Sequence, residues 1–218
     1  MSSRKRHGIK KTVSFSDDEA FLRRRSSKNE NKRMGLLNPP VYVRKTIGTV
    51  PIHLPGLTYY YLKISNDFDT VRLLYMLIVT QLLFLVFQFN RNTIYGNKRL
   101  KIHFGSLAIS IVACFLLTLP CMLLIVLMGA PFGMLLWETW LLAAHCCFLA
   151  FPAVYSVFNC DFKVGVFKNY FLSICIGCWV SCVVIPLDWD RPWQEWPIPL
   201  VVGGYLGAFV GYTICSYV

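Results

Sequence analysis

The short stretch IPLDWDRPWQEWPIP, residues 185–199, separates two apolar segments and carries three tryptophans, three acidic residues, one arginine and four prolines. Five of its residues form a tight cluster of polar and aromatic groups: Asp188, Trp189, Asp190, Arg191 and Trp193. An arginine can hold a phosphate or a carboxylate with paired N–H donors, whereas a tryptophan favours the membrane–water interface. A turn that only reversed the chain would need neither the aspartates nor the arginine. The cluster therefore indicates a contact site for a partner protein or a lipid headgroup.

A second pair of ionisable residues, Glu138 and His145, lies in the apolar segment LLWETWLLAAHCC. Seven residues of helix place both side chains on one face about two turns, or ~10 Å, apart, which is too far for a direct pair. Two interpretations remain open. Glu138 is an interfacial carboxylate and His145 bonds to a neighbouring helix, or the two belong to a lipid-headgroup or metal site that other helices complete.

Catalytic patterns are missing from the sequence. It contains no Gly-rich phosphate loop, no HExxH and no GxSxG, which are the common signatures of nucleotide, zinc and serine-hydrolase chemistry. Cys175 and Cys178 form a CxxC with no second pair nearby, so a zinc site is not expected. We expect no catalytic residue, no metal and no cofactor.

Small residues mark the last apolar segment, where Gly203, Gly207 and Gly211 recur at four-residue intervals. This spacing lets a second helix approach backbone to backbone. The second helix belongs either to the same bundle or to a partner subunit.

The elements that must position these residues are membrane helices. The chain has a mean hydropathy of +0.51 and 15% charged residues, against about a quarter in soluble domains. A spanning helix needs roughly 20 apolar residues. The sequence predicts an all-α integral membrane protein with a six-helix bundle over residues 47–218, whose spans are 47–64, 70–89, 104–128, 135–157, 169–187 and 197–218.

Lysines and arginines are concentrated in residues 1–46, which hold 13 of the 22. Their composition predicts a disordered basic tail. The apolar body behind it favours an anionic membrane surface over nucleic acid as the partner. Within the tail, Ser14 and Ser16 lie between basic and acidic residues and are candidate phosphorylation sites.

Basic residues favour the cytosolic side of a membrane. With six spans and a cytosolic N-terminus, the tail and the loops 90–103 and 158–168 place 19 of the 22 lysines and arginines in the cytosol. Both termini are then cytosolic, and the turn 188–196 lies in the lumen or outside the cell.

Several of these motifs resemble the PIG-F family of glycosylphosphatidylinositol (GPI) anchor biosynthesis. They are ETWLLAAH, FPAVYSVFNCDFKVG, IPLDWDRPWQEWPIP and the glycine-rich last helix. KKTVSFSDD, PPVYVRKT and QFNRNTIYGNK are similar to the fungal branch. The turn at 185–199 is the most specific of these, because hydropathy alone would not produce it.

The resemblance implies a multispanning protein of the endoplasmic reticulum membrane. It implies an accessory role, in which the protein stabilises large ethanolamine phosphate transferases that carry a luminal catalytic domain. Those partners add phosphoethanolamine to mannoses of the GPI precursor. The alternative is an intramembrane enzyme or carrier that handles phosphatidylethanolamine or the GPI precursor through Glu138 and His145.

Overall fold

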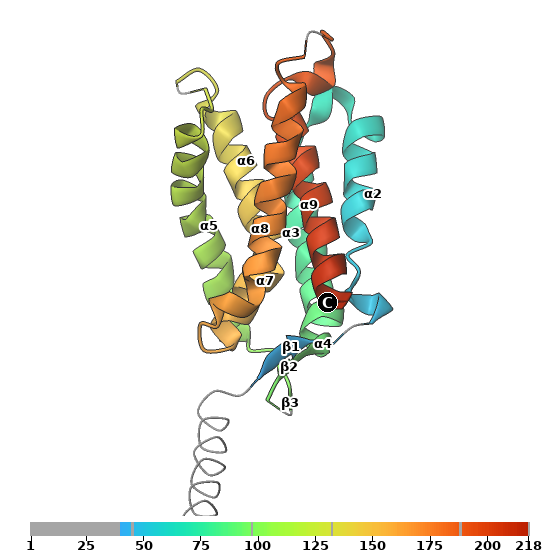
Figure 1. The fold of residues 1–218 in the computed structure, drawn as a ribbon, viewed down its shortest axis with the longest axis vertical. Coiled ribbons are helices and arrows are strands. Elements are labelled where there is room, and N and C mark those ends of the chain that lie inside the picture. Colours follow the sequence, from blue (N-terminus) through green and yellow to red (C-terminus); the bar gives the residue numbers. More distant parts are fainter. Residues whose placement is uncertain (1–39, 45, 97, 132, 188, 218) are drawn as a thin grey trace, which may run out of the picture. The chain divides into compact units, whose positions relative to one another are not determined.

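The computed structural model describes residues 40–217 with gaps at 45, 97, 132 and 188; for residues 66, 216 and 217 it describes the backbone alone. Seven helices form most of the bundle: α2 (His53–Tyr59), α3 (Thr70–Phe84), α5 (Phe104–Leu127), α6 (Leu136–Leu149), α7 (Phe151–Asn159), α8 (Val164–Ser181) and α9 (Ile198–Tyr217). If α6 and α7 are taken as one bent unit, successive helices of the bundle run in opposite directions (Figure 1). The loops therefore gather at two ends of the bundle.

Two of the helices continue beyond their α-helical bounds. A π-helical turn, Tyr60–Ile64, extends α2. A second π-helical turn, Leu85–Phe89, joins α3 to α4 (Asn90–Asn92). The central helix is α9, whose most extensive contact is with α8.

Four helices are long and apolar enough to cross a membrane: Thr70–Asn92, Phe104–Leu127, Val164–Val184 and Ile198–Cys215. The pair α6 and α7 makes a fifth span if it is taken as one bent unit. The predicted first span, 47–64, contains a 3-10 turn at Ile47–Thr49 and then the helix His53–Ile64. Twelve helical residues extend about 18 Å at 1.5 Å per residue, against roughly 30 Å of hydrocarbon. The described residues therefore form an all-α membrane protein with four or five candidate spans.

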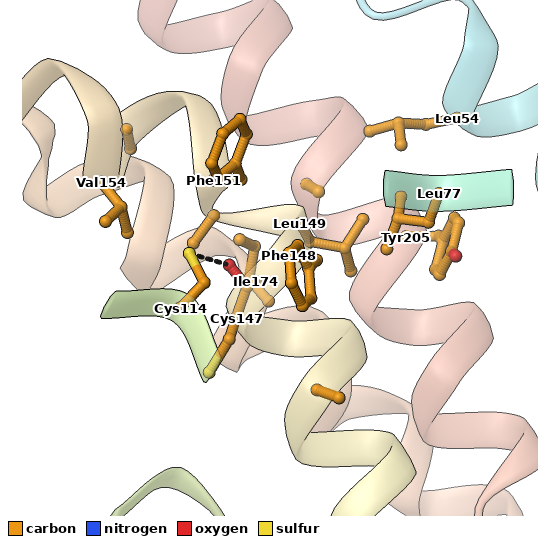
Figure 2. Packing of buried hydrophobic residues seen from close by; sticks show 14 of the residues in the cluster. Leu54, Leu77, Cys114, Cys147, Phe148, Leu149, Phe151, Val154, Ile174 and Tyr205 are labelled. Atoms are coloured by element: carbon orange, nitrogen blue, oxygen red, sulfur yellow. Dashed lines mark hydrogen bonds between the residues drawn. The ribbon is translucent and has the colours of Figure 1, made fainter. Parts of the chain in front are cut away.

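The span expected at 135–157 is broken at Ala150, where α6 and α7 meet at 52°. Pro152 causes the break because proline has no N–H and its ring clashes with the carbonyl four residues earlier. The break also separates carbonyl oxygens in the last turn of α6 from the N–H groups that a continuous helix would supply, and two of them find other donors. Leu149 O accepts from Gln81 Nε2 at 3.4 Å and from the Tyr212 hydroxyl at 3.0 Å, and Cys147 O accepts from Cys114 Sγ at 3.6 Å (Figure 2).

The same break lies in the centre of the apolar core. Figure 2 shows Phe148, Leu149 and Phe151 in the core cluster of buried residues, to which Leu77, Ile174 and Tyr205 of α9 also belong. All six of these side chains are buried. In a membrane interior every polar backbone group needs an internal partner, and the bonds to Leu149 O and Cys147 O supply one for two of the carbonyl oxygens at the break.

A small antiparallel sheet closes one end of the bundle (Figure 1). Its strands are β1 (Val41–Val43), β2 (Thr93–Tyr95) and β3 (Lys98–Arg99), in the order β1-β2-β3. Val43 pairs with Thr93 and Ile94 pairs with Arg99. Valine, isoleucine, threonine and tyrosine suit strands, and Gly96, at φ +64°, fits the tight turn of a hairpin. With this sheet included, the compact unit begins at Val41.

Large apolar side chains also cover the outside of the bundle. The outward face of α3, continued through the π-helical turn Leu85–Phe89, consists of Val71, Tyr75, Val79, Leu83 and Phe87, each exposed and four residues from the next. Most of α5 is likewise apolar and exposed. Such a surface suits hydrocarbon better than water.

Candidate functional site

The turn between α8 and α9 is held in place by Gln194. Its Nε2 donates to the carbonyl oxygens of Val184, at 2.9 Å, and Leu187, at 2.7 Å. Its Oε1 accepts from the backbone N–H of Arg191 at 3.0 Å. The side chain is buried. The side-chain amide of Gln194 thus connects Val184 and Leu187, which follow α8, to the 3-10 turn Pro192–Gln194.

A second anchor ties this turn to α6. Trp196 Nε1 donates to the Thr139 hydroxyl at 3.2 Å, and Thr139 is fully buried. The peptide bond between Trp196 and Pro197 is cis. Gln194 and Trp196 together fix the corner from inside.

The outer edge of the turn is formed by Trp189, Asp190 and Arg191, which are exposed. Trp189 and Trp193 lie with their ring centroids 5.9 Å apart. Asp190 has a φ of +49°, a left-handed conformation that aspartate tolerates better than most residues. Among the residues described, no side chain bonds to the Arg191 guanidinium; Asp188 lies outside them. The side chains of Trp189, Asp190 and Arg191 are not partners in the bonds that Gln194 and Trp196 make.

A mainly apolar groove of about 430 Å³ lies beside the turn, between the α2 segment and α8 over α9. Trp193, Leu62, Val202 and Leu206 line it, and Lys63 lies at its wall. Aromatic and charged groups on the turn are thus continuous with an apolar surface. This combination is typical of a contact surface in a membrane protein.

The structure places Glu138 and His145 in different surroundings. Glu138 is in the first turn of α6 and is partly exposed. His145 is fully buried, with Nδ1 3.1 Å from the Tyr205 hydroxyl and Nε2 3.1 Å from the carbonyl oxygen of Thr70. Both ring nitrogens have partners on other helices, and the pair does not converge on one site.

The glycine face of α9 packs against α8. A Cβ added at Gly207 would lie 3.0 Å from Gly177 Cα, and one added at Gly177 would lie 2.8 Å from Gly207 Cα. Added atoms at Gly203 and Gly211 would collide with Ser181 and Ser173. The close approach that the spacing predicts therefore occurs inside this bundle, between α8 and α9.

The cysteines are all free thiols. Cys178 Sγ lies 3.7 Å from Cys146 Sγ and donates to Leu200 O at 3.5 Å. Across the described part of the chain, no group of three or more His, Cys, Asp or Glu residues is arranged to hold a metal ion. Ser14 and Ser16 lie outside the described residues.

Sequence reasoning missed Gln194 and the residues that bond to the broken helix. Gln194 lies between charged and aromatic residues, and its type alone gives no sign of a structural role. Gln81 and Tyr212 are polar residues within apolar segments, and Pro152 lies inside a predicted span. A polar residue in a membrane helix needs a partner, and a proline in a helix leaves a carbonyl oxygen without its donor. The polar residues in the neighbouring apolar segments could therefore have been predicted to bond to carbonyl oxygens near the proline.

Comparisons with known proteins identify the family. Residues 49–216 match the family described as "GPI biosynthesis protein family Pig-F". The chain is 58% identical over 216 residues to "Glycosylphosphatidylinositol anchor biosynthesis protein 11" of Saccharomyces cerevisiae, covering 99% of this chain and 98% of that protein. It is 55% identical over 221 residues to the protein of the same name from Kluyveromyces lactis, covering 100% of both. No solved structure matches. The chain belongs to the PIG-F family of GPI biosynthesis proteins.

Proposed function

We propose that this protein is a non-catalytic, stabilising membrane subunit of the ethanolamine phosphate transferases that add phosphoethanolamine to mannoses of the GPI precursor. The observation that carries the proposal is the α8–α9 turn. Gln194 and Trp196 hold its corner from inside, whereas the side chains of Trp189, Asp190 and Arg191 are exposed and are not partners in those bonds; Arg191 contributes only its backbone N–H. A hydrogen-bonded corner that presents an aromatic pair and an arginine with no side-chain partner among the described residues is suited to docking.

The docking surface combines this turn with the adjoining apolar groove. The groove is large enough for side chains of a partner's membrane helix, and Trp193 belongs to both the turn and the groove. A partner with a membrane helix and a domain at this membrane surface would contact both. Arg191 would then pair with a carboxylate of the partner, and contact with a lipid phosphate is the lesser possibility.

We further propose that the chain crosses the endoplasmic reticulum membrane six times with both termini cytosolic. Four of the crossings are the long apolar helices and a fifth is the bent pair α6 and α7. The sixth is residues 47–64, of which only the last twelve form a continuous helix, so the rest of this crossing is a short 3-10 turn and non-helical chain.

The two ends of the bundle differ in charge. The end with the sheet and the α7–α8 connection carries Asp161 and the basic residues Arg44, Arg91, Lys98, Arg99, Lys101, Lys163 and Lys168. The opposite end carries three basic and five acidic described residues, which are Lys63, Arg72, Arg191, Asp67, Asp69, Glu138, Asp190 and Glu195. The positive-inside rule places the first end in the cytosol and the turn in the lumen.

The buried polar groups support assignment of the chemistry to the partner. His145 bonds to Tyr205 and Thr70, and Gln81 and Tyr212 bond to the broken helix. These groups stabilise the packing of helices, and no observation favours the alternative of an intramembrane enzyme built on Glu138 and His145.

The experiment is affinity purification of the tagged chain in mild detergent, followed by mass spectrometry of proteins and lipids. We expect an ethanolamine phosphate transferase to co-purify with the wild type. Purification without any such transferase, from cells in which both are expressed, would contradict the proposal.

A further inference from the structure

Three arginines line one cavity at the end of the bundle that carries the sheet. The cavity has a volume of about 270 Å³, and its walls are Arg44, Arg91, Arg99, Phe87, Asn92 and Ile94. None of these wall residues is acidic. The cavity lies at the other end of the bundle from the α8–α9 turn (Figure 1).

The sheet brings the arginines together from three separate segments. Arg44 follows β1, and its backbone N–H donates to Asn92 O at 2.6 Å. Arg99 lies on β3 opposite Ile94 of β2, and Arg91 belongs to α4. Side-chain bonds hold the framework, since Asn90 Nδ2 donates to Leu100 O at 3.1 Å and Asn92 Nδ2 to Gln88 O at 2.7 Å.

Three positive charges around one cavity repel one another, and an anion in the cavity would offset that repulsion. Guanidinium groups match phosphate oxygens with paired N–H donors. A water molecule takes up roughly 30 Å³ in the liquid, so the cavity has room for a phosphate group together with part of its ester. The charge and the size of the cavity both fit a phosphate ester.

An apolar groove continues from this cavity along α3. It has a volume of about 240 Å³ and is lined by Ile52, His53, Thr80, Leu83, Phe84, Phe87 and Gln88. Phe87 forms a wall of both the cavity and the groove. Leu83 and Phe87 also belong to the outward face of α3, which we assign to the hydrocarbon. A free phosphate would use the cavity alone, whereas a phospholipid would fill both.

We propose that the protein binds an anionic phospholipid at this end of the bundle. Its phosphate lies among Arg44, Arg91 and Arg99, and one acyl chain lies in the groove between Ile52 and Leu83. The adjoining groove favours a lipid over a soluble anion or a phosphorylated peptide. In the topology proposed above, the lipid belongs to the cytosolic leaflet, which carries anionic lipids. The site is independent of the α8–α9 turn, and its test does not depend on a transferase.

The test is lipid binding by the purified full-length chain, measured by native mass spectrometry with added dioleoyl phosphatidic acid. The triple variant Arg44→Gln/Arg91→Gln/Arg99→Gln should bind this lipid at least about tenfold more weakly, equivalent to about 1.4 kcal/mol. The matched control is Lys98→Gln/Lys101→Gln/Lys168→Gln. It removes three charges from the same end, at residues that do not line the cavity, and should lose less than about threefold. If the triple variant does not fold, the single variant Arg99→Gln, at an exposed position on β3, replaces it in the same lipid-binding measurement.

A groove variant separates a lipid from a free anion. Thr80→Phe should fill the groove and weaken phosphatidic acid binding, while leaving the binding of inorganic phosphate unchanged. Equal losses in the arginine and lysine variants would contradict the proposal, because general surface charge would then explain the binding. Unchanged lipid affinity in Thr80→Phe would also contradict it. A third test uses a peptide of residues 8–22 phosphorylated at Ser14 and Ser16 as a competitor. If this peptide binds the cavity more tightly than the lipid and displaces it, the proposal is contradicted, because the tail would then be the occupant.

Discussion

His145 bridges two helices of the bundle: Nδ1 lies 3.1 Å from the Tyr205 hydroxyl and Nε2 lies 3.1 Å from the carbonyl oxygen of Thr70. A carbonyl oxygen only accepts, so in the neutral ring Nε2 carries the proton and Nδ1 accepts from Tyr205. By sequence, His145 is a candidate for a lipid-headgroup or metal site. In the structure it instead takes part in the packing between α6, α9 and the start of α3.

The first prediction concerns this bridge. His145→Leu leaves the Tyr205 hydroxyl and the Thr70 carbonyl without their partner and should lower the free energy of unfolding by about 1–3 kcal/mol. Tyr205→Phe should cost less, and the double variant should cost less than the two single effects added together. Thermal unfolding in detergent measures this. Unchanged stability together with lost phosphoethanolamine addition, while the transferase stays bound, would instead assign a chemical role to His145.

The second prediction concerns the α8–α9 contact. Gly207→Leu places a branched side chain where Gly177 Cα lies 3.0 Å from an added Cβ, and close packing tolerates little extra volume. The variant should fold poorly. Gly105→Leu is the matched control, because nothing lies within 4 Å of a Cβ at that position. Folded yields of the two variants, measured by gel filtration in detergent, should differ several-fold; equal yields would contradict the contact.

The third prediction separates the inside of the turn from its outer edge. Arg191→Ala should leave thermal stability unchanged but reduce co-purified transferase, whereas Gln194→Ala should reduce both by removing two donors and one acceptor from the corner. Glu195→Ala should do neither. Arg191→Lys should restore binding only partly, because an ammonium lacks the planar fork. Normal co-purification with Arg191→Ala at matched expression would mean that the turn is only an interfacial corner.

The fourth prediction tests the topology by thiol labelling. Cys160, at the end of α7, is fully buried, and burial raises the pKa of its thiol to about 11. At pH 7.5 its thiolate fraction is then a few hundred-fold below that of an ordinary thiol of pKa about 8.5, so native Cys160 should resist a membrane-impermeant maleimide. Asp161→Cys, at an exposed position, should label in sealed microsomes from the cytosolic side.

The luminal counterpart of that test is Glu195→Cys. Glu195 is exposed, whereas the neighbouring Gln194 is buried and is a poor labelling position. Glu195→Cys should label only after the microsomes are permeabilised. Labelling of Glu195→Cys in sealed microsomes would contradict the six-span topology.

Long apolar runs made the main helices predictable. The expected spans 70–89, 104–128, 169–187 and 197–218 correspond to α3, α5, α8 and α9, because each run is long enough to cross the hydrocarbon. The break at Ala150 was not predicted, since hydropathy averages over Pro152. The sheet was not predicted either, because its strands have two or three residues and β1 lies about 50 residues from β2.

The candidate site was predictable in composition but not in geometry. Trp189, Asp190 and Arg191 are conspicuous by type, whereas the residue that fixes their corner, Gln194, is an ordinary amide whose three bonds exist only in the folded chain. The three-arginine cavity likewise depends on pairing between β1, β2 and β3. Spacing along the chain does not reveal either arrangement.

The most direct test of the central proposal is to deplete the protein in cells and to measure both the transferase and the GPI precursors. We expect the amount of an ethanolamine phosphate transferase to fall. The direct substrate of that transferase, a precursor that lacks one phosphoethanolamine, should accumulate, while the precursors formed earlier stay at normal levels. In parallel, the purified chain alone should not move phosphoethanolamine to a mannose acceptor. Transfer by the chain alone, or depletion that leaves the transferase and the precursors unchanged, would contradict the account.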